Sequence, residues 1–418
     1  MTTVSDSDPV MPDDDLSGVA GLRVLILNEN ESVPGDRRVW DISTTLASAG
    51  ADVVVICPQD ERGGSAQFES RDGVEIHRYR PSFAEGGPAG YVREYGQAFW
   101  STWSLVRRLS RERRFDIVHA CNPPDFLLFA ARPARRGGAR FVFDHHDLTP
   151  ELFRTRFGEN HRLLYRATLS LERWCFHAAD VVLATNESYQ EIARTRGGKS
   201  AEDVFIVRNA PNLNRLAQVT PDPSLKRGKP HLIGYLGVMA PQDGVDNAIR
   251  ALARLRERRQ DWHAVFGGEG SAVPELKELA DQLGLGDMVE FPGWMGDAEI
   301  GRLLSTSDVC LSPEPATPLN DRSTMVKIAE YMAMSRPIVA FSLRETRKSA
   351  DAAAVYAESG DIAAFADRIG ELLDDPQRRA EMGAIGRERV ERSMTWARST
   401  TELMAAYRRA MAHRVTAG

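Results

Sequence analysis

Short apolar runs alternate with longer stretches of helical periodicity along almost the whole chain, and this alternation constrains the fold more than any other feature. In the first half the apolar runs are LRVLILN (22–28), ADVVVICP (51–58), VEIHRY (74–79), FDIVHA (115–120), RFVFDHH (140–146), DVVLAT (180–185) and DVFIVRN (203–209). Strands that are apolar throughout and separated by helices predict a parallel sheet covered on both faces. The first half is therefore predicted to be a doubly wound α/β domain.

A second series of the same kind follows a break in the pattern. Residues 210–230 are rich in Pro and Asn and have no clear periodicity, which is typical of a linker. The alternation then resumes with HLIGYLG (231–237), HAVFGG (263–268), MVEFPG (288–293), VCLSP (309–313) and PIVAF (337–341). Because 418 residues exceed what one hydrophobic core usually serves, we expect two domains.

The predicted boundaries follow from these breaks. Residues 21–209 form a first Rossmann-like domain, 210–230 the linker and 231–394 a second Rossmann-like domain, while a helix at 395–415 is expected to pack back on the first. Residues 1–20 are acidic and lack a basic or apolar stretch, so they are predicted to be a disordered tail rather than a signal peptide. Two such domains in tandem predict a central cleft lined by the carboxyl ends of strands.

Composition and charge exclude several classes of protein. A formal charge of -6 argues against general nucleic-acid binding, and 42% hydrophobic with 27% charged residues is ordinary for a soluble globular protein. No segment approaches the roughly 18 consecutive apolar residues that span a bilayer. Four cysteines without CxxC spacing indicate reduced core thiols and a cytoplasmic location.

The most informative motif is NDRSTMVKIAEYMA at 320–333. A polar turn that enters a helix would offer free backbone N–H groups and the positive end of the helix dipole to an anionic diphosphate. Arg322 and Lys327 would add charge, and Ser323 and Thr324 either contact this ligand or cap the helix. Glu330 lies one turn beyond Lys327, where its carboxylate can accept hydrogen bonds from ribose hydroxyls. The alternative is a surface helix on which Lys327 and Glu330 merely pair.

This motif resembles the signature of retaining glycosyltransferases of family 4, and Glu-Tyr-Met-Ala at 330–333 is its most specific part. The resemblance implies a GT-B fold, two tandem Rossmann-like domains facing a central cleft, with a nucleoside-diphosphate sugar as co-substrate and no metal or other cofactor. It also implies the ribose role of Glu330. His146 with Asp147 matches the family's His-Asp pair, which approaches the donor sugar. One of the adjacent residues His145 and His146 is expected to serve packing.

Further segments match the family pattern in the same order along the chain, and two of them lie in the predicted second domain. Gly268 and Gly270 follow a strand and would let a phosphate or ribose approach the backbone. Gly293, Trp294 and Met295 match the segment that contacts the nucleobase, where Trp294 either covers a ring or packs in the core.

A loop after the first strand matches the family's acceptor side. Gly35 would permit close backbone approach there. Arg37 and Arg38 would contact an acceptor phosphate or simply the start of their own helix.

The chain departs from the family pattern at two places. The Arg and the Lys-Gly pair that bind the diphosphate in many members are absent from residues 237–244, and Arg322 stands where the family has its first glutamate. Arg322, Lys327 and Arg347 are expected to replace the missing charge. The alternative is a degraded donor site.

The acceptor is not identified by the sequence, and a lipid-linked saccharide, a polysaccharide precursor and a small metabolite all stay open. Residues 99–114 form an amphipathic basic helix with aromatic residues, which would rest on an anionic membrane or be a solvated face packed by its tryptophans. A second basic run at 132–140 lies downstream. The leading hypothesis is a glycosyltransferase. The alternatives are another GT-B enzyme, such as a sugar-nucleotide epimerase or a phosphorylase, and a non-catalytic nucleotide-sugar binding protein.

Overall fold

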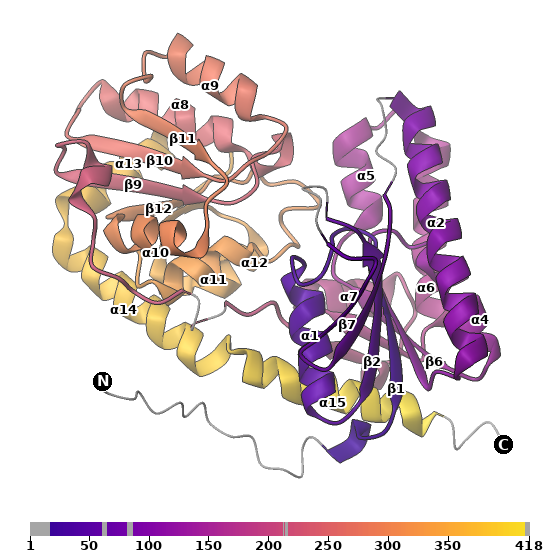
Figure 1. Cartoon of the computed structure of the whole chain (residues 1–418). Helices are drawn as coiled ribbons and strands as arrows, with labels where there is room; N and C mark the ends of the chain where they lie inside the picture. Colours follow the sequence, from indigo (N-terminus) through magenta and orange to yellow (C-terminus); the bar gives the residue numbers. More distant parts are fainter. Residues whose placement is uncertain (1–16, 61–64, 82–86, 212, 214–215, 414–418) are drawn as a thin grey trace. The chain divides into compact units, whose positions relative to one another are not determined.

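The chain forms two compact units in a computed structural model that describes residues 17–60, 65–81, 87–211, 213 and 216–413 (Figure 1). Unit 1 comprises Met1–Arg208 and Ala397–Gly418, and unit 2 comprises Asn209–Trp396. Residues 1–16 of the predicted tail and residues 414 and 415 of the predicted last helix lie outside the described residues.

Unit 1 is built on an eight-stranded sheet with the order β3-β4-β2-β1-β5-β6-β7-β8. Its strands are β1 (Arg23–Leu27), β2 (Asp52–Pro58), β3 (Phe68–Arg71), β4 (Val74–Tyr79), β5 (Ile117–Cys121), β6 (Arg140–His145), β7 (Val181–Ala184) and β8 (Val204–Ile206). The predicted parallel sheet is confirmed, because every neighbouring pair except β3–β4 is parallel. The edge strand β3 has the sequence FESR and is mostly exposed, so no apolar run announced it.

The helices of unit 1 cover this sheet (Figure 1). They are α1 (Arg37–Ser48), α2 (Gly87–Glu112), α3 (Leu127–Ala130), α4 (Arg132–Arg136), α5 (Thr149–Phe157), α6 (Arg162–Ala178), α7 (Glu187–Thr195) and α15 (Trp396–Ala412). Asp36 caps α1, because its side chain accepts from the Val39 amide.

Helix α15 packs within unit 1, although it follows unit 2 in the sequence. Tyr407 is fully buried, and its hydroxyl lies 2.8 Å from His119 Nδ1 on β5. Arg409 pairs with Asp203 at 2.8 Å, and the Ser399 hydroxyl donates to the Arg208 carbonyl. The last helix is therefore part of the packing around the unit 1 sheet.

Unit 2 has a six-stranded parallel sheet with the order β11-β10-β9-β12-β13-β14. Its strands are β9 (His231–Leu236), β10 (Trp262–Gly267), β11 (Val289–Gly293), β12 (Val309–Ser312), β13 (Ile338–Phe341) and β14 (Ala354–Ala357). Its helices are α8 (Val245–Arg256), α9 (Val273–Gln282), α10 (Asp297–Thr306), α11 (Val326–Ala333), α12 (Arg344–Ala350), α13 (Ile362–Asp374) and α14 (Pro376–Ser393).

The segment expected as a linker, 210–230, packs on unit 2 where it is described. Leu216 is fully buried, the Val219 amide donates to the Ser305 hydroxyl at 3.0 Å, and the Asp222 amide donates to the Thr306 hydroxyl at 2.9 Å. Residues 212, 214 and 215 lie outside the described part.

Each sheet has one point where the order of its strands reverses. In unit 2 the chain moves outward from β9 to β11 on one side and from β12 to β14 on the other, so this point lies between β9 and β12. In unit 1 it lies between β1 and β5. Ligands of open α/β sheets bind outside the carboxyl ends of the strands at such points.

Candidate functional site

Lys327 is a buried lysine in the first turn of α11 in unit 2. Its Nζ lies 2.6 Å from Glu314 Oε1 and 2.8 Å from the Tyr235 hydroxyl, and 4.3 Å from the centroid of the Tyr235 ring. The Ser312 hydroxyl donates to the other oxygen of Glu314. Burial opposes the charge of Lys327, but Glu314 and Tyr235 outweigh it and raise the pKa of Lys327 above its ordinary range. The ammonium is therefore charged.

Gly237 makes room for this ammonium at the carboxyl end of β9. Its φ is +145°, and a Cβ there would lie 2.9 Å from Lys327 Cε and 3.1 Å from Nζ. The loop after β9 is the one that lacks the family's Arg and Lys-Gly pair. Lys327 thus lies against this loop, and its role as the replacement cation stays a prediction.

The polar turn before α11 differs from the predicted cap. Met325 occupies the N-cap position, so neither Ser323 nor Thr324 is the cap residue. The Ser323 hydroxyl donates to the Leu319 carbonyl at 2.9 Å, and Arg322 Nη1 donates to the Pro318 carbonyl at 3.0 Å. These bonds are made within the turn itself.

Glu330 is half-buried on α11, three residues beyond Lys327. The alternative of a solvent-exposed Lys327–Glu330 pair does not fit, because Lys327 is only 8% exposed and is bonded to Glu314 and Tyr235.

Arg347 lies on the exposed side of α12. Its Nε donates to the Ser342 hydroxyl at 2.6 Å, and its guanidinium lies 4.4 Å from the Tyr356 ring centroid. Asp321 holds the start of α12 to the polar turn, because its carboxylate accepts from the Arg344 amide at 2.8 Å.

The glycines after β10 have a structural reason of their own. Gly268 has a φ of +129°, and a Cβ there would lie 2.0 Å from the Gly237 carbonyl oxygen. A Cβ at Gly270 would lie 2.2 Å from the Met239 carbonyl oxygen. Both glycines therefore let the loops after β9 and β10 touch each other, whatever ligand approaches them.

At the end of β11, Trp294 is exposed, whereas Met295 packs against buried residues. Gly293 has a φ of +84° and Trp294 is 59% exposed, so core packing is the wrong description of this tryptophan. Met295 is the packed residue, since a Cβ at Gly267 would lie 2.5 Å from its sulfur.

In unit 1, His146 and Asp147 directly follow β6, and Asn122 holds their backbone. The amides of His146 and Asp147 both donate to Asn122 Oδ1, at 2.9 and 3.1 Å, and Asn122 Nδ2 donates to the Asp147 carbonyl at 2.8 Å. Sequence reasoning missed Asn122. Its signal was its place, because it is a polar residue directly after the apolar run of β5.

His145 is the packing histidine of the pair. It is fully buried, its Nε2 lies 3.3 Å from Glu172 Oε1, and its ring centroid lies 4.9 Å from that of Phe176. The His146 side chain is 12% exposed, and its Nδ1 lies 3.6 Å from Asp144 Oδ2. Burial lowers the pKa of His146, but Asp144 more than offsets this and raises it.

Arg38 has a different role from the predicted acceptor contact. It is buried, and its Nε and Nη2 donate to the two oxygens of Asp144 at 2.8 and 2.7 Å, while Nη1 donates to the Val207 carbonyl at 2.7 Å. Arg37 is exposed as the first residue of α1. A Cβ at Gly35 would lie 2.9 Å from the Ser32 carbonyl oxygen, so a tight turn requires this glycine.

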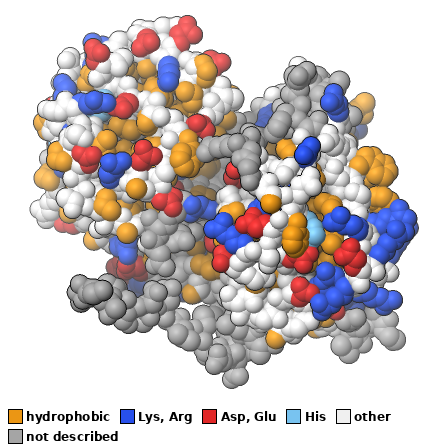
Figure 2. Space-filling model, viewed as in Figure 1, with side chains coloured by type: hydrophobic (Ala, Val, Ile, Leu, Met, Phe, Trp, Pro, Cys, Tyr) orange, Lys and Arg blue, Asp and Glu red, His pale blue; other side chains and the backbone are white. Residues whose placement is uncertain are grey.

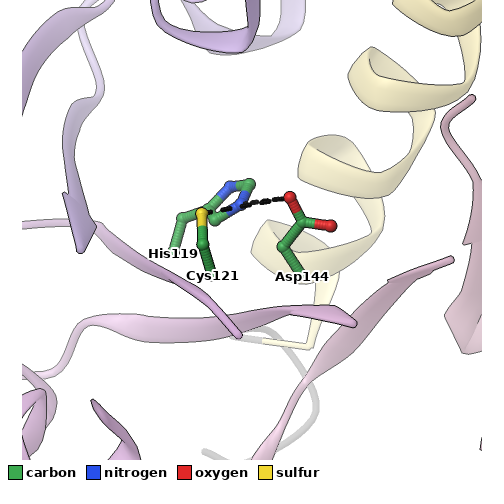
Figure 3. A group of neighbouring side chains, drawn as sticks. All are labelled: His119, Cys121 and Asp144. Atoms are coloured by element: carbon green, nitrogen blue, oxygen red, sulfur yellow. Dashed lines mark hydrogen bonds and ion pairs between the residues drawn. The ribbon is translucent and has the colours of Figure 1, made fainter. Parts of the chain in front are cut away.

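Asp144 also belongs to a buried group with His119 and Cys121, whose potential ligand atoms lie within 4.8 Å of one another (Figure 3). The group fits a metal ion poorly, because the Arg38 guanidinium already occupies both oxygens of Asp144. Burial and Asp144 raise the pKa of Cys121 well above its usual value, which disfavours the thiolate that binds metals.

Two family models match the chain, one in each unit. A model described as a glycosyl transferase 4-like domain matches residues 35–210, and one described as glycosyl transferases group 1 matches residues 230–375. An α-D-kanosaminyltransferase of Streptomyces kanamyceticus is 30% identical over 36% of this chain and 38% of that protein. A glycogen synthase of Mycobacterium tuberculosis is 24% identical over 86% of this chain and 87% of that protein.

Solved structures share the fold over nearly the whole chain. Sucrose-phosphate synthase from Thermosynechococcus elongatus gives a TM-score of 0.77 at 16% identity, covering 94% of this chain and 100% of that one. Anabaena HepE, solved in complex with UDP-glucose, gives a TM-score of 0.68 at 17% identity, covering 95% and 100%. The matched models, the relatives and the two Rossmann-like units agree, and the chain belongs to the glycosyltransferases of family 4, with the GT-B fold.

Proposed function

We propose that this glycosyltransferase uses a nucleoside-diphosphate sugar as donor and retains the anomeric configuration, with unit 2 holding the nucleotide. The observation that carries the proposal is the buried ammonium of Lys327 beside Gly237, at the point where the strand order of unit 2 reverses. The complex of HepE with UDP-glucose supports the same class of donor.

The diphosphate is the charged part of such a donor. Breaking the bond between the sugar and the diphosphate builds negative charge on the phosphate oxygens, and fixed cations and N–H groups lower that barrier. Lys327 and the first amides of α11 supply them in this proposal. Arg322 and Arg347 add further positive charge on the elements next to α11.

The nucleoside is placed by the neighbouring loops. Glu330 accepts hydrogen bonds from the ribose hydroxyls, one turn of α11 from Lys327. The exposed indole of Trp294 covers a face of the base, and the main chain of Gly293 and Met295 lies along its edge.

The sugar and the acceptor are assigned to residues of unit 1. His146 and Asp147 contact the transferred sugar, and Gly35 and Arg37 line the acceptor position. In the retaining step the acceptor oxygen bonds to the anomeric carbon, the bond from that carbon to the diphosphate breaks, and the acceptor's proton passes to a diphosphate oxygen on the same face. No pair of carboxylates flanking the bond is required.

A ligand panel tests the donor proposal. UDP-, GDP- and dTDP-sugars are added to the full chain, and thermal unfolding is compared between the wild type, Glu330→Ala and Glu381→Ala. Glu381 is a matched control, because it is an exposed helical glutamate of unit 2 on α14. We expect one nucleotide to stabilise the wild type and Glu381→Ala but not Glu330→Ala. No stabilisation by any of them contradicts the proposal.

Turnover separates the alternatives. A transferase releases the nucleoside diphosphate in step with a glycosylated acceptor, and proton NMR of that product reports its anomeric configuration. Conversion of the donor sugar without transfer identifies an epimerase, and binding without any turnover identifies a non-catalytic binding protein.

For the acceptor, we propose a molecule presented at an anionic membrane. None of the helices in the described part of the chain combines the length and apolarity needed to cross a bilayer. The proposed contact is peripheral, and the face formed by α2, α3, α4 and α6 supplies both the basic and the apolar side chains that such contact needs.

This face is basic and carries exposed aromatic and aliphatic side chains. A groove of about 410 Å³ between α2 and α4 is lined by Trp103, Arg107, Ser110, Arg111, Arg132, Pro133 and Arg136. Trp100, Phe129, Leu163, Leu164 and Trp174 are exposed, and the rings of Phe129 and Trp174 touch across α3 and α6. Figure 2 shows Lys and Arg side chains gathered on the side of unit 1 where Figure 1 places α4.

A further inference from the structure

We propose that Asp144, clamped by Arg38, is a positioning residue whose carboxylate faces the ring of His146 and favours the imidazolium form beside the donor sugar. The role of His146 at the sugar rests on the proposed function, whereas the effect of Asp144 on His146 does not.

The clamp on Asp144 is rigid and has a high energetic cost. Arg38 donates to both carboxylate oxygens, and the two side chains are 6% and 0% exposed. Removing two charges from water costs so much that a buried ion pair is weak evidence of a purely stabilising role. A function of the carboxylate explains the pair better.

A histidine on β5 lies beside the same carboxylate. His119 Nε2 lies 3.4 Å from Asp144 Oδ2, and the Tyr407 hydroxyl lies 2.8 Å from His119 Nδ1. If Nε2 carries the hydrogen toward the carboxylate, Nδ1 accepts from Tyr407. Figure 3 shows the His119 ring turned toward Asp144, with Cys121 beside it. The last helix of the chain is thereby connected to the residue that faces His146.

The backbone of His146 is held by a hydrogen bond, and its ring lies beside a carboxylate. Asn122 Oδ1 accepts from the His146 amide, and Asp144 Oδ2 lies 3.6 Å from the buried Nδ1, which is an ion-pair distance and not a hydrogen bond. With a proton on Nδ1 facing the carboxylate, the opposite nitrogen of the imidazolium is a donor. That nitrogen would donate to an oxygen of the sugar or the diphosphate as the bond breaks.

The titratable and charged groups around this pair come from five elements and the loop after β6. They are Asp36 and Arg38 at α1, His119 and Cys121 on β5, Tyr407 on α15, Arg156 on α5, and His145 and Asp147 beside His146. Burial lowers the pKa of His146, and Asp144 is the largest opposing influence on it.

The test is a pH titration of the full chain with isotope-labelled histidine, followed by NMR. The His146 signals are assigned by their loss in His146→Gln. An opposite charge at this range shifts a pKa by about 1–3 units, so we expect Asp144→Asn to lower the pKa of His146 by at least about 1 unit. Asp203→Asn is the matched control, because Asp203 also pairs with an arginine and a histidine in unit 1, and it should leave that pKa unchanged.

A second variant guards against loss of folding. Arg38→Met with Asp144→Asn removes the cation together with the carboxylate, so no buried charge is left alone, and it should lower the pKa of His146 as well. An unchanged pKa in either folded variant overturns the proposal.

Activity gives an independent readout once a donor is known. The alkaline limb of the kcat profile should move to lower pH in Asp144→Asn by the same amount as the pKa measured by NMR. A profile that does not move would show that Asp144 has only a structural role. If the pKa moves but no donor binds, the positioning stands and the proposed function fails.

Discussion

Replacing Lys327 by Met should both destabilise unit 2 and weaken the binding of the donor. A second substitution should separate these two effects. Lys327→Met leaves the Glu314 carboxylate, which is 1% exposed, without its ammonium. Breaking one side of a buried pair costs about 3–5 kcal/mol. For a domain of this size the unfolding midpoint falls by roughly 2–4 °C per kcal/mol, so a drop of about 6–20 °C follows.

The double variant Glu314→Gln with Lys327→Met removes both charges. Its stability should recover most of the loss, because no unpaired buried charge remains. Its affinity for the donor should not recover, since the diphosphate still lacks its ammonium. Losing a hydrogen bond to a charged group costs about 1.5–3 kcal/mol, which raises the dissociation constant roughly 10- to 150-fold.

The assay combines differential scanning calorimetry of the three proteins with calorimetric titration of the donor found in the nucleotide panel. Two results would refute the reasoning. One is a double variant that binds the donor as tightly as the wild type. The other is a Lys327→Met protein as stable as the wild type, which would mean that the pair is not buried as the structure has it.

Three further predictions concern other parts of the chain. Gly268→Ala should lower the free energy of unfolding by more than Gly293→Ala in denaturant titration, because both have positive φ but only Gly268 would place a Cβ against a carbonyl oxygen. Burial and Glu172 raise the pKa of Asp125 to about 7, above its unfolded value of about 3.9, so its contribution to stability falls as pH rises from about 4 to 7. Denaturant titrations at several pH values measure how the free energy of unfolding depends on pH, and Asp125→Asn should make this dependence less steep between about pH 4 and 7. An unchanged dependence would contradict the raised pKa of Asp125. In a vesicle sedimentation assay, Arg107→Gln with Arg111→Gln should lower the partition coefficient onto anionic vesicles about 30-fold, at about 1 kcal/mol per arginine. Wild-type protein that binds neutral vesicles as well as anionic ones would contradict membrane contact through charge.

The sequence predicted the parts of the fold that depend on local pattern. Buried parallel strands are mostly apolar, so most of their runs were visible, and the predicted strands match observed ones within a few residues. The short apolar strand β14 was not predicted. The polar edge strand β3 has no such run and was missed. The cap of α11 was misplaced, because Ser323 and Thr324 are typical cap residues, whereas Met325 is the N-cap residue and the Ser323 hydroxyl donates to the Leu319 carbonyl.

The site was predicted as residue types but not as pairings. Arg38 and Asp144 are 106 residues apart in the sequence, and only the tertiary fold brings them together. Lys327 was expected to be a cation for the diphosphate, yet its partner Glu314 was not foreseen, since it lies 13 positions earlier in the sequence, before the loop that leads to α11. Asn122 acts through its side chain on the backbone of a distant loop, a contact that local periodicity does not encode.

The most direct test of the account is a crystal structure of the full chain with the nucleoside diphosphate that the panel selects. The account predicts a diphosphate oxygen within hydrogen-bond distance of Lys327 Nζ and ribose hydroxyls on Glu330. A nucleotide bound without contact to either residue would contradict it.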